Sequence, residues 1–114
     1  MRQRMIQALN LTDAQQQQAN SIFQQAKQQA QPIVQQLKQN REALEAAVKA
    51  NNVSQIQTLA TQQGTLRGQV LAIRSTAWAQ FYSMLTPDQR AKADQIHQQM
   101  KQRMQQRFHQ RLDG

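Results

Sequence analysis

Apolar and small side chains recur in this chain at alternating steps of three and four residues, and this spacing limits what the chain can fold into. The first set is Ala19, Phe23, Ala26, Ala30, Ile33, Leu37, Asn40, Leu44 and Ala47. The second set is Ile56, Leu59, Gln63, Leu66, Val70, Ile73, Ala77, Phe81 and Met84. A third, looser set is Ala93, Ile96, Met100, Met104, Phe108 and Leu112. Such steps place each set on one face of a helix, whereas a strand needs strict alternation, so the sequence predicts an all-α fold.

Three interruptions divide these sets into separate predicted helices. Two asparagines at 51–52 form a turn between antiparallel helices, and the segment 85–89 separates the second set from the third. Pro32 lies within the first set, where its missing backbone donor is expected to kink or split the helix. We therefore expect four helices, near 12–30, 33–50, 53–84 and 87–111. They form a long helical hairpin within a single domain of residues 1–114.

The composition decides between helix and disorder and points to an assembly. Glutamine accounts for 28 of the 114 residues, against only 3 glycines and 2 prolines. Glutamine favours helix, and a chain so poor in glycine and proline is not a typical flexible linker. The apolar stripes are narrow, and long thin helices leave much surface unburied in a single chain. We therefore expect an elongated homodimer, because a second copy covers that surface most readily.

The pattern Leu-Thr-x-x-Gln occurs twice in the chain. Its residues are Leu11, Thr12 and Gln15 in the first copy and Leu85, Thr86 and Gln89 in the second. The pattern predicts a capping box, in which the threonine hydroxyl and the glutamine side chain each bond a backbone N–H of the first helical turn. Pro87 suits the first helical position, and Asp13 and Asp88 place negative charge at the positive end of the helix dipole. One such box is a common local device, but two that each open a helix are less common.

With these two motifs the chain resembles the Spy/CpxP family of periplasmic stress proteins, which is marked by paired Leu-Thr-x-x-Gln motifs. The first motif extends back through Leu9 and Asn10. The residues 80–84, Gln-Phe-Tyr-Ser-Met, are similar to the family's apolar and aromatic approach to its second motif. The resemblance extends from residue 5 to residue 108 and includes the lengths and order of the helices. It looks closer to Spy than to the metal-handling relatives.

The resemblance implies a cradle-shaped antiparallel homodimer in the periplasm, with a signal peptide already removed from the chain. It implies an ATP-independent chaperone that binds unfolded or partly folded client proteins on a concave basic and apolar surface and suppresses their aggregation. The alternative is a CpxP-like regulatory protein that binds the periplasmic domain of an envelope-stress sensor kinase. Both activities use the same fold and the same charged concavity, so the sequence does not separate them.

The residues predicted to bind clients are apolar positions with basic neighbours. They are Phe23, Lys27, Ile33, Val34, Lys38, Arg41 and Leu44. The formal net charge of +8 attracts acidic clients over a distance that salt shortens, and modest apolar surface then retains them. For Phe23, Ile33 and Leu44 taken singly, a place in the core or in a dimer interface is the simpler interpretation.

Small and aromatic side chains on the predicted third helix suggest close packing. Gly64 and Gly68 belong to a row of small residues at steps of four, which predicts a close helix crossing, either within the chain or across the dimer. The alternative is a flexible point in a long helix. Trp78, Phe81 and Tyr82 are expected to form the packed elbow before the second motif rather than a base-stacking platform.

Other functional classes find little support in the residues. The chain has no cysteine and no glycine-rich phosphate loop, and its acids are few and scattered. We therefore expect no catalytic residues, no cofactor and no enzymatic activity. His97 and His109 are twelve residues apart, too far to share one ion, so we expect no metal site. The sequence has no run of about 18 apolar residues, so we expect no stable insertion into a membrane. The basic charge suits nucleic acid, but no recognition motif accompanies it, and we expect no such partner.

Overall fold

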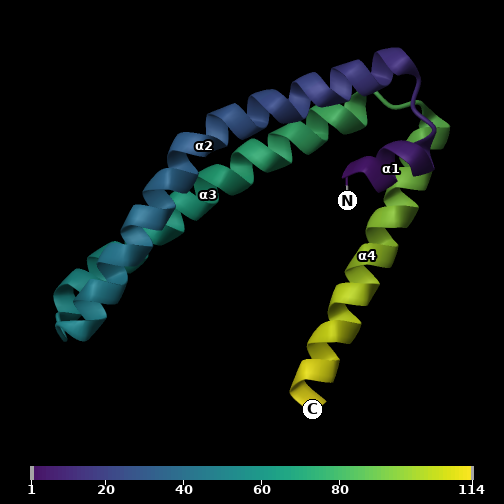
Figure 1. Cartoon of the computed structure of the whole chain (residues 1–114). Coiled ribbons are helices and arrows are strands. Elements are labelled where there is room, and N and C mark those ends of the chain that lie inside the picture. The colour runs from purple at the N-terminus through teal and green to yellow at the C-terminus, as the bar shows by residue number, and fades with distance from the viewer. Residues whose placement is uncertain (1, 114) are drawn as a thin grey trace. The chain divides into compact units, whose positions relative to one another are not determined.

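The computed structural model describes residues 2–113, with the side chains of residues 6–109, and within this range each regular element is a helix. The helices are α1 (Arg2–Leu9), α2 (Asp13–Lys49), α3 (Val53–Ser83) and α4 (Pro87–Asp113), as Figure 1 shows. The all-α prediction is confirmed. Contacts divide the chain into a hairpin unit, Ala19–Phe81, and an end unit that combines the chain up to residue 18 with the chain from residue 82. None of the helices described is both long enough and apolar enough to cross a bilayer.

The division into helices differs from the prediction at two places. Residues 2–9 form a helix that the sequence did not indicate, and α2 continues through Pro32, so the predicted break there is wrong. The Pro32 ring is exposed, and so is Gln28, whose carbonyl would otherwise pair with the missing N–H. A carbonyl that faces solvent is satisfied by water, so the helix curves without breaking, as Figure 1 shows.

The first apolar set on α2 and the second set on α3, up to Phe81, form the seam of the hairpin, as predicted, while Met84 follows the end of α3. Every residue of the first set and every residue of the second set is buried or half-buried. Buried alanines at 19, 30, 47 and 77 keep the seam narrow. The third set is only partly covered, because Ala93 is buried but Met104 and Phe108 are 69% and 62% exposed. The side chain of Leu112 lies outside the described residues.

A buried polar pair sets the register of the hairpin. The Asn40 Nδ2 group donates to Gln63 Oε1 at 2.7 Å and to the Leu59 carbonyl oxygen at 2.9 Å. Both side chains are buried, so sliding one helix past the other would leave amide groups without partners away from water. A single polar pair within an apolar seam is a well-attested way to select one register. The pair therefore places Asn40 opposite Gln63.

The turn between α2 and α3 uses its two asparagines differently. Asn51 has φ 55° and closes α2 in the left-handed conformation, with its N–H bonded to Val48 O at 3.1 Å and the next N–H bonded to Ala47 O at 3.0 Å. Asn52 opens α3, because its Oδ1 accepts the Gln55 N–H at 3.2 Å. The turn predicted at this position thus has a specific hydrogen-bond pattern.

Candidate functional site

Both predicted capping boxes are present in the end unit. The Gln15 N–H donates to Thr12 Oγ1 at 3.1 Å, and the Gln89 N–H donates to Thr86 Oγ1 at 3.2 Å. In return, each glutamine Oε1 accepts the backbone N–H of its own threonine at 3.0 Å. Each box therefore satisfies two backbone donors that the start of its helix would leave unpaired.

The two motifs also bond to each other through their glutamines. Gln15 Nε2 donates to Gln89 Oε1 at 2.9 Å, and Gln89 Nε2 donates to Gln15 Oε1 at 3.1 Å. The second hydrogen of each amide reaches a backbone carbonyl, Met84 O at 3.4 Å from Gln15 and Leu9 O at 3.3 Å from Gln89. Each amide thus uses two donors and two acceptors, the full capacity of the group. This motif junction ties the starts of α2 and α4 to the ends of α1 and α3.

Apolar side chains support the motif junction. Leu11 and Leu85, the first residues of the two motifs, are buried, as are Leu9 and Ala93. A capping box stabilises only the first turn of its own helix. The buried leucines add to this stability, because their side chains are removed from water. The side-chain amides of the junction bond to each other and to two backbone carbonyls, so the junction holds the helix ends together.

An exposed cluster surrounds Tyr82 in the end unit. Its phenol donates to Asp94 Oδ2 at 3.1 Å, and the Arg90 guanidinium lies 5.4 Å from the ring centroid. Arg90 also donates to the carbonyls of Tyr82 and Ser83, at 3.2 and 3.0 Å, and so caps the last turn of α3. Partial removal from water, followed by the hydrogen bond to Asp94 and its charge, raises the pKa of Tyr82 above 10.0, while the charge of Arg90 acts in the opposite direction.

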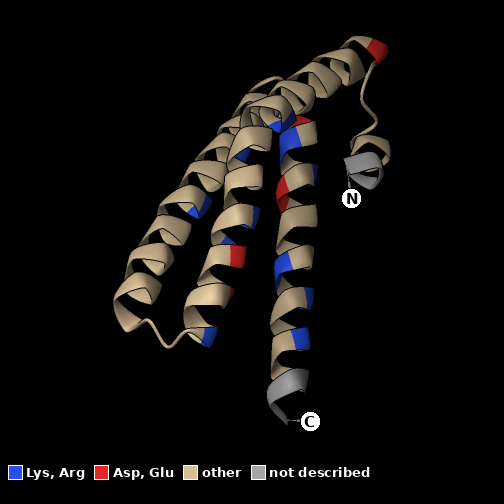
Figure 2. Ribbon diagram, turned by 60° about the vertical axis from the view of Figure 1, so that its left-hand side comes forward, with Lys and Arg blue, Asp and Glu red and all other residues tan. Residues whose placement is uncertain are grey.

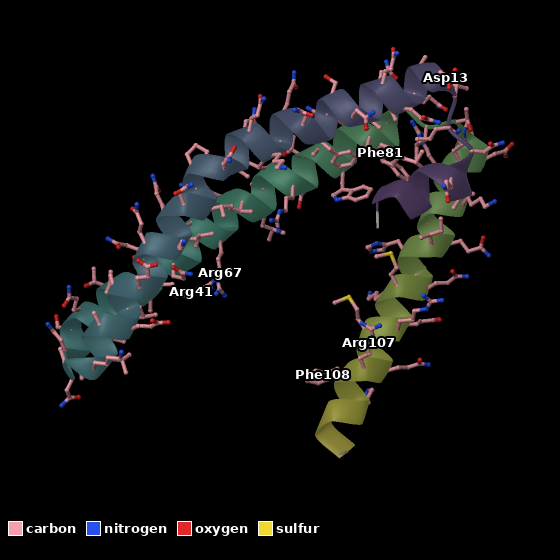
Figure 3. The ribbon with its side chains drawn as sticks, viewed as in Figure 1. Asp13, Arg41, Arg67, Phe81, Arg107 and Phe108 are labelled. Atoms are coloured by element: carbon pink, nitrogen blue, oxygen red, sulfur yellow. The ribbon has the colours of Figure 1, made fainter. Side chains whose placement is uncertain are left out.

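One flank of the hairpin collects basic and exposed apolar side chains, and we call it the basic face. Its residues are Lys27, Val34, Lys38 and Arg41 on α2 and Arg67, Leu71, Arg74 and Trp78 on α3. All eight are exposed, and their steps of three, four and seven place each run on one side of its helix. Figure 3 shows Arg41 and Arg67 on the same side of the hairpin, and Figure 2 shows the basic positions of both helices.

A groove of about 590 Å³ lies in the basic face. It is lined by Val34, Leu37, Lys38, Arg41, Arg67, Val70, Leu71 and Arg74. Four of these residues are cationic, four are aliphatic, and none is acidic. Like charges brought together repel each other, so this arrangement does not serve the stability of the hairpin. The groove has the chemistry of a binding surface for anionic and aliphatic groups.

The opposite flank of the hairpin, which we call the amide face, has no charge along its groove. This second groove, of about 580 Å³, is lined by Gln36, Gln39, Asn40, Thr61, Gln62, Thr65 and Leu66. Its amides and hydroxyls donate and accept hydrogen bonds with water equally well. Charged side chains therefore line the groove of the basic face and not that of the amide face.

The predicted client-binding residues divide between the basic face and the seam. Val34, Lys38 and Arg41 line the groove, and Lys27 is exposed on the same flank. Ile33 and Leu44 are half-buried in the seam, where the core interpretation fits them better. Phe23 is also half-buried, with its ring centroid 5.0 Å from that of Trp78 and 5.6 Å from that of Phe81.

The sequence prediction missed the part of the groove that α3 contributes. Arg67, Leu71 and Arg74 are spaced by four and three residues, so their common flank could be read from the sequence. Their position beside Lys38 and Arg41 depends on the register of the hairpin, which the Asn40–Gln63 pair fixes. That pairing required the structure.

The expected aromatic elbow divides into two separate groups. Trp78 and Phe81 pack with Phe23 of α2, with the Trp78 and Phe81 rings 5.5 Å apart and perpendicular. These rings close the hairpin near the open ends of α2 and α3 rather than the passage to α4. Tyr82 belongs to the end unit and contacts α4 through Asp94 and Arg90.

The two helical glycines do not pack closely within the chain. A Cβ atom added at Gly64 or Gly68 meets no atom of another element within 4 Å. The intrachain form of the predicted helix crossing is therefore wrong, because nothing in the described chain approaches these backbones. Packing of this row against a second copy stays a prediction.

The titratable side chains do not form a metal site in the described part of the chain. Among these residues no group of three His, Asp or Glu side chains is placed to hold an ion. His97 is exposed on α4, and the His109 ring stacks edge-on to Phe108, with centroids 6.4 Å apart.

The chain matches the family described as LTXXQ motif family protein over residues 2–97. This range includes the motif junction and the whole hairpin, so the similarity is not limited to the two short motifs. No curated protein and no solved structure matches the chain.

Proposed function

We propose that this chain, which belongs to the LTXXQ motif family, is an ATP-independent chaperone for unfolded or partly folded proteins. The observation that carries the proposal is the groove of the basic face, where four cations and four aliphatic side chains meet without an acid. The resemblance to Spy and CpxP supports a periplasmic location, and we place the chain there as part of the proposal.

The two kinds of side chain in the groove have separate tasks in this mechanism. Lys38, Arg41, Arg67 and Arg74 attract acidic segments of a client over distances of about 10 Å and raise the association rate. Exposed aliphatic groups, such as Val34 and Leu71, then retain the client through weak burial. The groove is a surface depression between two helices, so it accepts an extended chain of varied sequence rather than one rigid ligand.

The amide face complements this mechanism. It lacks the charges and most of the apolar groups that would capture a client, so a bound client occupies one side of the hairpin. Its glutamines and threonines remain hydrated, which keeps the loaded chaperone in solution.

We also propose that the working form is a homodimer. The exposed glycines of α3 support it, because a bare stretch of helix backbone allows a second helix to approach closely. The exposed Met104 and Phe108 of α4 are further apolar groups that a second copy could cover.

The proposal is tested by mixing the chain with a reduced, acidic model protein that aggregates, without ATP. We expect aggregation to be suppressed at equimolar ratio, and capture to slow in about 0.5 M salt, where exposed charges are screened. Unchanged capture in salt would contradict the electrostatic half of the mechanism. A failure to suppress aggregation would contradict the chaperone function and leave the sensor-kinase regulator as the alternative.

A further inference from the structure

We infer that the groove of the basic face also binds fatty carboxylates, which are single-chain amphiphiles with one anionic head. The inference concerns a small-molecule site in the hairpin and does not depend on client binding. It rests on the combination of an aliphatic floor and a cationic rim in one groove of about 590 Å³, a size within the range of ligand sites.

The apolar part of the groove suits an alkyl chain. Its floor is formed by Val70, which is buried, and Leu37, which is half-buried, while Val34 and Leu71 stand exposed at its edges. All four side chains are aliphatic and none is aromatic, so the lining offers no flat ring surface for a nucleobase to stack on. The groove follows α2 from Val34 to Arg41, which is about 10 Å of helix.

The charged part of the groove suits a carboxylate. Lys38, Arg41, Arg67 and Arg74 all line it, and no acidic side chain is among the lining residues. Arginine presents two parallel N–H donors that match the two oxygens of a carboxylate. Because α2 and α3 are antiparallel and Asn40 faces Gln63, Arg41 and Arg74 mark opposite ends of the groove. A bound amphiphile therefore finds a cation for its head in either orientation.

A neutral amphiphile and a small anion would each use only half of this lining. A neutral head leaves four cations without a counterion, and acetate leaves the aliphatic floor in water. The fatty carboxylate satisfies both halves at once, and this is the basis for choosing it as the occupant.

Isothermal titration calorimetry of the whole chain with dodecanoate, below its micelle concentration, tests the inference. We expect one dodecanoate per chain and weaker binding by about tenfold in the double variant R67Q/R74Q, which removes two charge-assisted contacts. The matched control K101Q/R103Q removes two exposed charges from α4 and is expected to bind as the unaltered chain does. The variant L71Q, at a 66% exposed position, tests the aliphatic half and should also weaken binding.

Several outcomes would overturn the inference. They are equal affinity for dodecyl maltoside, equal affinity for acetate, an equal loss in the α4 control, or no binding at all. The emission of Trp78, the only tryptophan of the chain and a neighbour of Arg74 on the basic face, gives a second readout of occupancy. The titration contains no client, so a negative result leaves the chaperone proposal standing, and a failed aggregation assay leaves this site standing.

Discussion

At the scale of single residues, the motif glutamines show why the pattern ends in Gln rather than Glu. A capping box accepts either residue, and the helix dipole favours the carboxylate at this position. In this protein each glutamine also donates to the other glutamine and to a backbone carbonyl. A carboxylate has no hydrogen to donate, so the bond between the motifs, and not the box, requires the amide.

The substitution Gln89→Glu separates these two roles. It keeps the acceptor for the Thr86 N–H but removes the donors to Gln15 and to the Leu9 carbonyl. We expect a loss of about 1–3 kcal/mol in the free energy of unfolding, because partly buried groups lose their partners. Urea denaturation measures it. Equal or greater stability in the variant would show that the box alone accounts for the motif.

Tyr82 gives a pH-dependent prediction at the same scale. The folded chain holds the phenolic proton more tightly than the unfolded chain, since the pKa of Tyr82 is raised above 10.0. The resulting stabilisation is present below pH 10 and is lost as the pH rises through the folded pKa. Tyr82 is the only tyrosine, so ultraviolet titration reads it directly. Asp94→Asn should lower its pKa toward 10, and an unchanged value would contradict the contribution assigned to the Asp94 hydrogen bond and charge.

At the scale of helices, α3 contains two glycines that weaken it without an intrachain reason. A methyl group added at either position would meet no neighbour within 4 Å, and a glycine inside a helix costs about 1 kcal/mol relative to alanine. We expect Gly64→Ala and Gly68→Ala each to raise the free energy of unfolding by about that amount, measured at a dilution where the chain is monomeric. Destabilisation there would mean that another part of the chain contacts these positions.

The features of these helices that could be predicted are those set by residues close together in the sequence. The seams and the capping boxes follow from spacing within one helix, so the sequence was sufficient for them. The break predicted at Pro32 is wrong, because the effect of a proline depends on whether its position faces water. The spacing of apolar residues indicates this poorly for a position at the edge of an apolar stripe. The bond between Gln15 and Gln89 joins residues 74 positions apart, and the groove joins two helices. Both needed the tertiary pairing.

At the scale of the whole molecule, the two glycines of α3 give a test of whether this row of small residues forms a dimer interface. If a second copy packs on this row, the double variant G64L/G68L should be monomeric in sedimentation equilibrium under conditions where the unaltered chain is dimeric. Leucine there would hold the two backbones apart. Gln69→Leu, on the uncharged side of the same helix, is the matched control and should leave the dimer intact. A dimeric double variant would exclude the row as an interface.

The whole chain has a formal net charge of +8, and under the proposed function we expect client capture to depend on where that charge lies rather than on its total. In the hairpin, four basic residues line the groove of the basic face, whereas amides and hydroxyls line the groove of the amide face. The helix α4 is also basic, and Met104 and Phe108 are exposed apolar groups on it, but the groove that brings four cations and four aliphatic side chains together lies in the hairpin. Client capture should therefore follow the basic face.

The most direct test compares R67Q/R74Q with K101Q/R103Q, two variants of equal net charge, in capture of an acidic unfolded client at low salt. All four positions are exposed, so both variants should keep the helical circular dichroism of the unaltered chain. We predict that the rate of capture falls on the order of tenfold in R67Q/R74Q and stays near that of the unaltered chain in K101Q/R103Q. An equal fall in both would show that net charge, and not the basic face, captures the client.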